Sequence, residues 1–186
     1  MTQEARLEST DTGLVPADGG WFVLNARDAR WYHTDGRTAV CAFEAEEGGG
    51  EFTQLGINVN VLNPGEIMAM YHWEADQEDF LVLAGEATLI VEGEERPLRT
   101  WDFVHCPPGT KHTIVGAGNG PAVVVAVGAR EKSAGAKEGW GGYTVDEAAG
   151  RHGASVEQDT TEPKEAYAGL TRRDRVKYRD GWLPGA

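Results

Sequence analysis

The alternation of apolar and polar residues along the chain predicts a series of short β-strands. In residues 52–62 the alternation is clean, with Leu55, Ile57, Val59 and Val61 on one face and Asn58 and Asn60 on the other. Successive side chains of a strand point to opposite faces, so this run predicts a strand with two different environments. Other runs suited to strands are 21–24, 38–44, 87–91, 96–99, 101–106, 112–115 and 122–127. Short strands separated by Gly/Pro turns are typical of an all-β sandwich or barrel.

The two ends of the chain differ from this middle region. Residues 1–20 are polar and interrupted by glycine and proline, which predicts a flexible N-terminal arm before a β-domain over 21–130. Residues 131–186 are expected to hold a linker, short helices and a basic tail. The linker is the glycine-rich stretch Gly135–Gly142, and the tail is the cluster Arg172–Arg179. We expect this tail to pair with the acidic body or with a second subunit.

Two short helices are predicted in the C-terminal part. The sequence Thr144-Val-Asp-Glu147 has the form of a capping box, which predicts a helix that runs to about His152 and stops at Gly153. A second helix is expected to begin near Pro163, because proline suits a first helical turn, and to end by Gly169.

Charge and cysteine content narrow the function classes. The 186 residues include 17 Lys and Arg against 30 Asp and Glu, a formal net charge of −13 at pH 7. This excess of negative charge argues against nucleic acid and anionic membranes as partners. No apolar run is long enough for a transmembrane helix, and the N-terminus lacks the pattern of a signal peptide. Cys41 and Cys106 fit a reducing compartment, with a disulfide as the less favoured alternative. We therefore expect a cytoplasmic protein.

Candidate metal ligands concentrate in the stretch Gly65–Gly85 and in a second one, Cys106–His112. In an extended strand His72 and Glu74 share one face, because they are two residues apart. Glu78 opens the next apolar run, and His112 opens another strand after a Pro-Gly turn. Imidazole and carboxylate together suit a borderline or hard divalent cation. The predicted ligands are His72, Glu74, Glu78 and His112, with Asp79 as the fallback for Glu78.

These two stretches resemble the paired motifs of the cupin superfamily. The first motif is matched by Gly65, His72, Glu78 and Gly85, and the second by Asp102, Pro107, Gly109 and His112. Three positions depart from the pattern: Glu74 stands where a second histidine is usual, Trp101 replaces a glycine, and Gly116 replaces a common asparagine. The resemblance covers roughly residues 50–128. It implies a double-stranded β-helix, a divalent metal ion (Fe, Mn or Zn) in the barrel, and a homodimer formed through edge strands.

The role of Glu74 stays open at this point. If Glu74 is a ligand, two carboxylates cancel the charge of the cation and favour Mn²⁺ or Fe²⁺ over copper. If it is not, His72, Glu78 and His112 form the two-His, one-carboxylate set that non-haem iron oxygenases use, and Glu74 becomes a candidate catalytic general base. The third alternative is a salt bridge from Glu74 to a nearby Arg or Lys.

The remaining candidates were assigned by strand phase. His105 is expected to point away from the site, because Val104 and Cys106 face the interior. Met68, Met70, Phe80 and Val82 are expected to line an apolar pocket floor that suits a partly hydrophobic small molecule. Two functions follow. One is a metal-dependent enzyme of the oxygenase or isomerase type, and the other is a non-catalytic cupin module that binds a small polar ligand such as a sugar.

Overall fold

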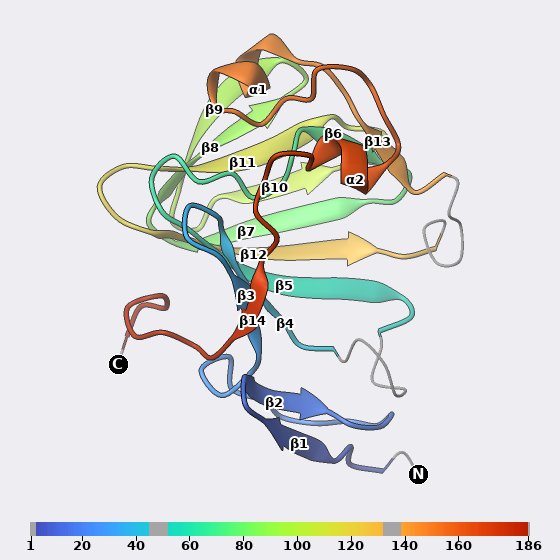
Figure 1. The fold of residues 1–186 in the computed structure, drawn as a ribbon, viewed down its shortest axis with the longest axis vertical. Coiled ribbons are helices and arrows are strands. Elements are labelled where there is room, and N and C mark those ends of the chain that lie inside the picture. The colour runs from blue at the N-terminus through green and yellow to red at the C-terminus, as the bar shows by residue number, and fades with distance from the viewer. Residues whose placement is uncertain (1–2, 45–51, 132–138, 186) are drawn as a thin grey trace.

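The computed structural model describes residues 3–44, 52–131 and 139–185, and most of its regular structure is β-strand (Figure 1). The strands are β1 (Leu7–Thr10), β2 (Gly13–Pro16), β3 (Trp31–His33), β4 (Ala39–Ala42), β5 (Leu55–Leu62), β6 (His72–Glu74), β7 (Glu78–Ala84), β8 (Glu86–Val91), β9 (Glu94–Arg99), β10 (Phe103–Cys106), β11 (His112–Ala117), β12 (Ala122–Ala129), β13 (Gly141–Tyr143) and β14 (Asp174–Val176). The helices are α1 (Glu147–Arg151) and α2 (Pro163–Ala166). Neither is long enough to cross a bilayer, and no other described segment forms a helix that does.

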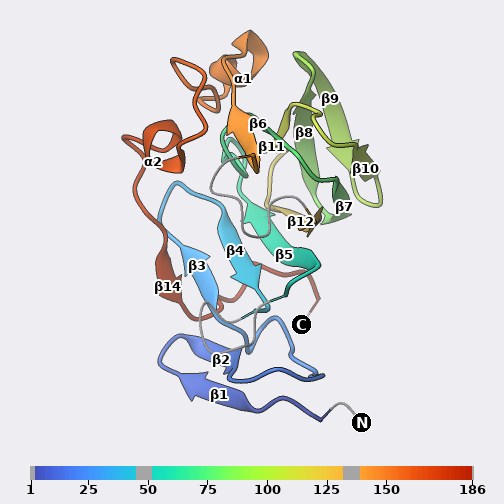
Figure 2. The ribbon, with the colours of Figure 1, turned by 90° about the vertical axis from the view of Figure 1, so that its right-hand side faces the viewer.

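Two antiparallel sheets form the body of the fold, and the predicted double-stranded β-helix is confirmed. One sheet has seven strands in the order β10-β7-β12-β5-β4-β3-β14, and the other has five in the order β13-β6-β11-β8-β9. Figure 2 shows the second sheet above β5 and β4. Sequence neighbours β6 and β7 therefore belong to different sheets, as do β10 and β11. This exchange brings short motifs on successive strands to opposite walls of one interior.

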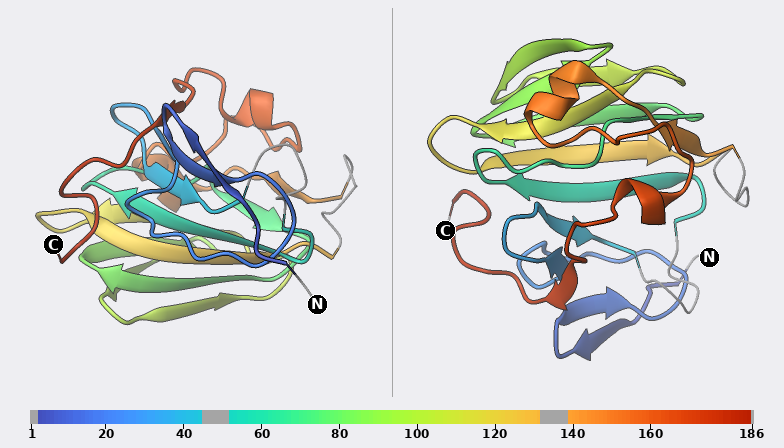
Figure 3. Two further views of the ribbon diagram at one scale, coloured as in Figure 1. Left: turned by 90° about the horizontal axis from the view of Figure 1, so that it is seen from below. Right: turned by 45° about the horizontal axis from the view of Figure 1, so that its top comes forward.

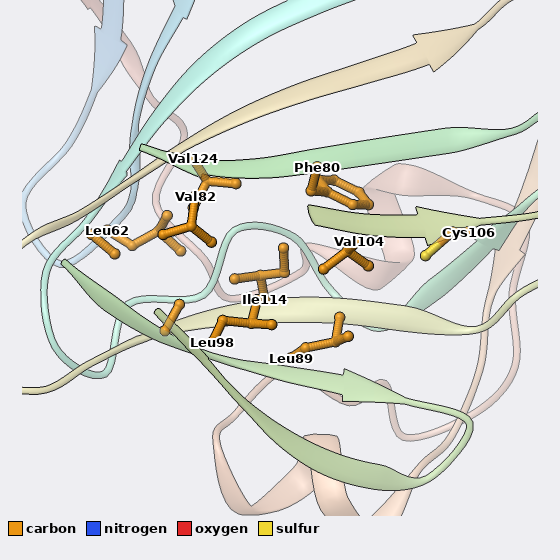
Figure 4. Packing of buried hydrophobic residues seen from close by; sticks show 11 residues of the cluster. Leu62, Phe80, Val82, Leu89, Leu98, Val104, Cys106, Ile114 and Val124 are labelled. Atoms are coloured by element: carbon orange, nitrogen blue, oxygen red, sulfur yellow. The ribbon is translucent and has the colours of Figure 1, made fainter. Parts of the chain in front are cut away.

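The core between the sheets is built from inward-facing apolar residues of both (Figure 4). The seven-stranded sheet contributes Leu62, Phe80, Val82, Val104, Cys106, Ala122 and Val124, and the five-stranded sheet contributes Ala87, Leu89, Leu98 and Ile114. Each fully buried large side chain contributes roughly 1.5–3 kcal/mol. The packing closes one end of the space between the sheets and leaves the other end to polar side chains.

Strand β5 shows why its two faces differ in polarity. Val59 and Val61 pack in a second cluster with Trp31, on the outer side of the sheet. Asn58 and Asn60 face a cavity between the sheets. The predicted separation of the two faces is confirmed, and the polar face is the one that points into the barrel.

The N-terminal part is more ordered than its composition indicates. Part of the expected arm forms the hairpin β1–β2, which lies below β3 and β4 in Figure 1 and is seen from below in Figure 3. The Thr10 hydroxyl donates a hydrogen bond to the Gly13 carbonyl at 2.6 Å and so stabilises the turn. The predicted strand at 21–24 is wrong. Trp21 forms only an isolated bridge to Glu4, and Val23 is 83% exposed, because no neighbouring strand offers this run a hydrogen-bonded ladder.

The C-terminal segment, residues 139–185, packs against the sheets along its length. Part of the expected linker is β13, which pairs with β6, while residues 132–138 lie outside the described part of the chain. A Cβ on Gly141 would lie 2.0 Å from the Trp73 carbonyl oxygen, so glycine permits this close pairing. Strand β14 adds to the edge of the seven-stranded sheet beside β3. The basic tail thus begins as an edge strand.

Both predicted helices are present, with one correction. The N-cap of α1 is Asp146, whose carboxylate accepts a hydrogen bond from the Ala149 N–H at 2.8 Å. Thr144 does not cap the helix, because it lies two residues before the cap. The helix ends at Arg151 and Gly153 follows with φ of 69°. Pro163 occupies the first turn of α2, as predicted.

Candidate metal centre

Strand pairing places the imidazoles of His72 and His112 next to each other. They are register partners in the antiparallel pair β6–β11, and their ring centroids are 4.9 Å apart. The turn before β11 sets this position: Gly109 has φ of 85°, and its N–H donates to the Glu74 carbonyl at 2.8 Å. That hydrogen bond ties the turn to β6, so the second motif is anchored on the first.

Glu78 reaches the same point from the opposite sheet. Its Oε2 is 3.6 Å from His72 Nε2 and 3.2 Å from His112 Nε2. One ligand atom from each of the three residues lies within 4.8 Å of the other two. Three of the four predicted ligands therefore converge at one place between the sheets.

The hydrogen bonds of the two imidazoles direct their free nitrogens toward Glu78. His72 Nδ1 lies 2.7 Å from the Met70 carbonyl oxygen, and His112 Nδ1 lies 3.0 Å from the Thr110 carbonyl oxygen. A carbonyl only accepts, so each Nδ1 carries a proton and donates it. Nε2 of each ring therefore points toward Glu78, which is the orientation that backbone partners impose on metal-binding histidines.

Two buried atoms of this group lack a hydrogen-bond partner among the described residues: Glu78 Oε2 and His112 Nε2. They are 3.2 Å apart but are not aligned for a hydrogen bond. Leaving buried polar atoms unpaired is costly, so such atoms in a native protein call for a partner such as a bound ion. The donor set of two imidazoles and one carboxylate fits a divalent cation of the first transition series.

Burial and neighbouring charges shift the pKa values of Glu78 and His112. Burial by itself raises the pKa of Glu78, but His112 and His72 outweigh it and lower that pKa to about 2. Burial also opposes a charge on His112, yet the adjacent Cys106 thiol and Glu78 carboxylate raise its pKa to about 10. Glu78 is therefore held ionised, as a metal ligand has to be.

Glu74 lies beside the three converging residues without joining them. Its Oε1 is 3.9 Å from His72 Nε2, and it borders the same cavity. Burial first, and the charge of Glu78 second, raise the pKa of Glu74 to about 7. Among the described residues no Arg or Lys forms an ion pair with it, so the salt-bridge alternative finds no support here.

The cavity has a volume of about 290 Å³ and a polar, partly aromatic wall. Met68 and Phe80 border it, as expected. Met70 does not: residues 68–71 bend instead of continuing as a strand, and Met70 packs in a separate cluster with Tyr143. Val82 is also displaced from the expected lining, because it is fully buried in the core between the sheets.

His105 and Asp79 lie on the outside of the barrel. They are register partners on β10 and β7, and His105 Nδ1 is 2.6 Å from Asp79 Oδ1. The expectation that His105 points away from the site agrees with this placement. Asp79, the fallback ligand, is excluded by the same strand phase.

Sequence reasoning missed the part of the cavity wall that comes from the C-terminal segment. Trp140 and Tyr143 flank His72, with ring centroids 6.4 and 6.0 Å from the imidazole. Tyr167 and Arg173 border the cavity farther along the chain. The sequence signal for Trp140 and Tyr143 is that two aromatic residues flank Gly141 and Gly142. The glycine content of this stretch predicts a linker instead. Arg173 was hidden within a run of basic residues.

Comparison with known proteins agrees with this geometry. A family model described as a cupin domain matches residues 58–128. The structure of the polyketide cyclase RemF from Streptomyces resistomycificus is similar with a TM-score of 0.50, at 14% identity over 60% of this chain and 80% of that one. A cupin-like protein from Thermotoga maritima matches with a TM-score of 0.45, at 20% identity over 54% and 73% of the two chains.

A putative sugar phosphate isomerase from Acidithiobacillus ferrooxidans matches with a TM-score of 0.46, at 24% identity over 54% of this chain and 67% of that one. No curated protein matches the sequence significantly. The region that the family model matches contains His72, Glu78 and His112 together with most of the two-sheet core. Residues 58–128 of this chain therefore match the cupin domain family.

Proposed function

We propose that this protein is a metal-dependent enzyme of the oxygenase or isomerase type, which acts on a small molecule in the cavity. The observation that carries the proposal is the convergence of His72 Nε2, His112 Nε2 and a Glu78 carboxylate oxygen. Two of these atoms are buried without a hydrogen-bond partner, which supports a cation as their common partner.

His72, Glu78 and His112 would hold the ion, and their chemistry fits Fe, Mn or Zn. When bound, such an ion polarises an oxygen atom of the substrate and stabilises negative charge that develops on it. Glu74 is the candidate catalytic residue beside it. Its pKa of about 7 lets it accept and return a proton near neutral pH. If Glu74 binds the ion as a fourth ligand, it loses that role.

The aromatic residues around His72 would orient the substrate and exclude water. Trp140 and Tyr143 lie against the imidazole of His72, and the ring of Phe80 lies 5.2 Å from that of His112. A drier site strengthens electrostatic interactions within it. Asn58 and Asn60 would supply amide groups for a polar part of the substrate.

The second candidate function is a non-catalytic module that binds a small polar ligand such as a sugar. The buried amide of Asn60 and its neighbour Asn58 favour it, because amides pair well with hydroxyl groups. In this case an ion either has a structural role or is not bound at all. If no ion is bound, adding a chelator should leave the melting temperature unchanged.

Elemental analysis of protein purified without chelator and without a His-tag tests the metal centre. We expect about one Fe, Mn or Zn per chain, and a loss of affinity of at least about 100-fold in His72→Ala and in His112→Ala. His105→Ala is the matched control, because His105 lies outside the barrel, and it should keep the metal. Retention of metal by a folded His72→Ala/His112→Ala variant would refute the assignment.

We also propose a cytoplasmic homodimer. Strand β10 is an edge of the seven-stranded sheet, and exposed aromatic residues lie on it and just before it: Trp101 is 72% and Phe103 63% exposed. An unpaired edge with apolar side chains is suited to association with a second copy. Cys41 and Cys106 are free thiols, which suits a reducing compartment. Light scattering of wild type and Phe103→Glu tests the dimer, and a monomeric wild type contradicts it.

A further inference from the structure

A groove of about 670 Å³ adjoins the cavity of the metal centre on the side of the C-terminal segment. Both spaces are bordered by Val40, Tyr167 and Arg173, so these three side chains form the partition between them. Figure 1 shows the elements involved: the chain runs from α2 past the sheets to β14, which lies beside β3.

The groove carries positive charge on a strongly acidic protein. Arg37, Lys164, Arg172 and Arg173 line it, and no acidic residue does. None of these four side chains forms an ion pair with another residue in the described part of the chain, whereas Arg179 nearby pairs with Asp35 at 3.8 Å. Four cations close together repel one another, and an anionic ligand offsets that repulsion.

The two inner guanidinium groups are held in place by backbone carbonyls. Arg173 donates from Nε to the Thr38 carbonyl at 2.8 Å and from Nη2 to the Met68 carbonyl at 3.2 Å. Arg37 donates from Nη1 to the Thr171 carbonyl at 2.9 Å, and its guanidinium lies 5.3 Å from the ring centroid of Tyr167. These bonds fix both groups before any ligand arrives, which reduces the entropy cost of binding.

Arg37 also has an unused donor, because its Nε is buried without a hydrogen-bond partner among the described residues. A planar guanidinium matches the two oxygens of a carboxylate or phosphate. The rest of the lining is apolar or aromatic and includes Tyr32 and Leu170. The groove is therefore suited to an oxyanion attached to a carbon skeleton.

We propose that this groove binds the carboxylate or phosphate group of the small molecule on which the protein acts, next to the metal centre. That the molecule is a substrate rests on the proposed function. Binding of an oxyanion by the groove does not, since none of its cationic residues belongs to the His–Glu–His group.

The test uses metal-free full-length protein, with inorganic phosphate and succinate as probes. Calorimetry measures affinity, and the Nε–Hε NMR signals of arginine report the location. The test variant is Lys164→Gln/Arg172→Gln, because neither side chain forms a hydrogen bond with another residue in the described ranges 3–44, 52–131 and 139–185. The control is Arg99→Gln/Lys177→Gln, which removes one arginine and one lysine at exposed positions outside the groove.

We expect saturable binding of at least one probe by wild type, with shifts of the Arg37 and Arg173 signals. The test variant should bind at least about tenfold more weakly and the control should not change. The tighter probe identifies the group as phosphate or carboxylate. Absence of saturable binding to wild type, or equal weakening in both variants, overturns the proposal.

Loading the protein with Mn²⁺ tests whether groove and metal centre share one site. Phosphate bound in the groove should then show enhanced ³¹P relaxation that decreases in Lys164→Gln/Arg172→Gln and not in the control. Enhancement that is equal in both variants places the phosphate on the ion and separates the groove from the site. A protein that binds the probes but no metal refutes the proposed function alone, and one that binds metal but no probe refutes the groove alone.

Discussion

The wall of the cavity comes from two different regions of the chain. Residues 58–128, which the cupin family model matches, supply the His–Glu–His group and most of the core. The C-terminal segment supplies Trp140, Tyr143, Tyr167 and Arg173. The first region provides the His–Glu–His group, which we call the metal end. The second provides aromatic surface and positive charge, which we call the C-terminal wall. The cupin family model covers the metal end and does not extend to the C-terminal wall.

The largest effect on stability is expected from Trp31→Ala, which removes a contact between β3 and the C-terminal segment. Trp31 is fully buried, and its ring lies 5.0 Å from that of Trp182 in the C-terminal segment. Its Nε1–H donates to the Ala26 carbonyl at 2.8 Å. Loss of this side chain should lower the free energy of unfolding by about 3–5 kcal/mol, measured by urea denaturation.

The control is Val23→Ala, which should change the free energy of unfolding by less than about 0.5 kcal/mol, because Val23 is 83% exposed and lies outside the proposed dimer edge. If Trp31→Ala costs less than about 1 kcal/mol, the C-terminal segment does not depend on this contact.

At the metal end, Glu78→Gln and Glu74→Gln should differ sharply in their affinity for Mn²⁺. Only Glu78 belongs to the converging group, so its amide variant should lose about 100-fold in affinity for Mn²⁺. Glu74→Gln should lose less than about tenfold, because its Oε1 lies 3.9 Å from His72 Nε2 and outside the converging group. Calorimetric titration with Mn²⁺ measures both. Equal losses would make Glu74 a fourth ligand and remove it as a general base.

Gly141→Ala should disturb both the C-terminal wall of the cavity and strand β6, because Gly141 is the register partner of Glu74. The added Cβ meets the Trp73 carbonyl oxygen at 2.0 Å, so β13 has to shift, and it carries Tyr143. We expect a loss of about 1–3 kcal/mol in unfolding free energy, altered fluorescence of Trp140 and weaker binding of Mn²⁺, because the clash is with the strand that carries His72. Gly120→Ala is the control, since its Cβ would meet open space. Unchanged stability of Gly141→Ala would mean that β13 adapts without strain.

The smallest effect is expected where β12 ends, at the ion pair of Arg130 and Glu44. Burial by itself raises the pKa of Glu44, but Arg130 outweighs it and holds the pKa below its ordinary value of 4.5. A lowered pKa in the folded state stabilises the protein above pH 4.5, and the contribution disappears as the pH falls through the folded value. Glu44→Gln should therefore cost up to about 1 kcal/mol at pH 7 and nothing in acid, measured by denaturation across pH.

Glu94→Gln is the matched control, since the pair of Glu94 and Arg96 is exposed on both sides. It should change stability little at any pH. A cost of Glu44→Gln that persists unchanged below pH 4 would show that the carboxylate acts by packing and not by charge.

The sequence by itself determined most strands of the two-sheet core and the three residues that converge between the sheets. Alternation placed Asn58 and Asn60 on the cavity side of β5, and motif spacing placed His72, Glu78 and His112 where a rolled sheet brings them together. Such signals are local, because a strand alternates with a period of two residues and a turn is set by its own glycine and proline. The same periodicity also correctly left His105 outside.

Only the tertiary structure decided the rest. The chain bends at residues 68–71, where it crosses from one sheet to the other. Met70 therefore does not follow the alternation of faces that a continuous strand would have. Gly141 became a strand residue and Arg173 part of the cavity wall through pairing with strands far away in the sequence. Contacts of this kind depend on which surfaces the folded barrel leaves available, and no local pattern of residues carries that information.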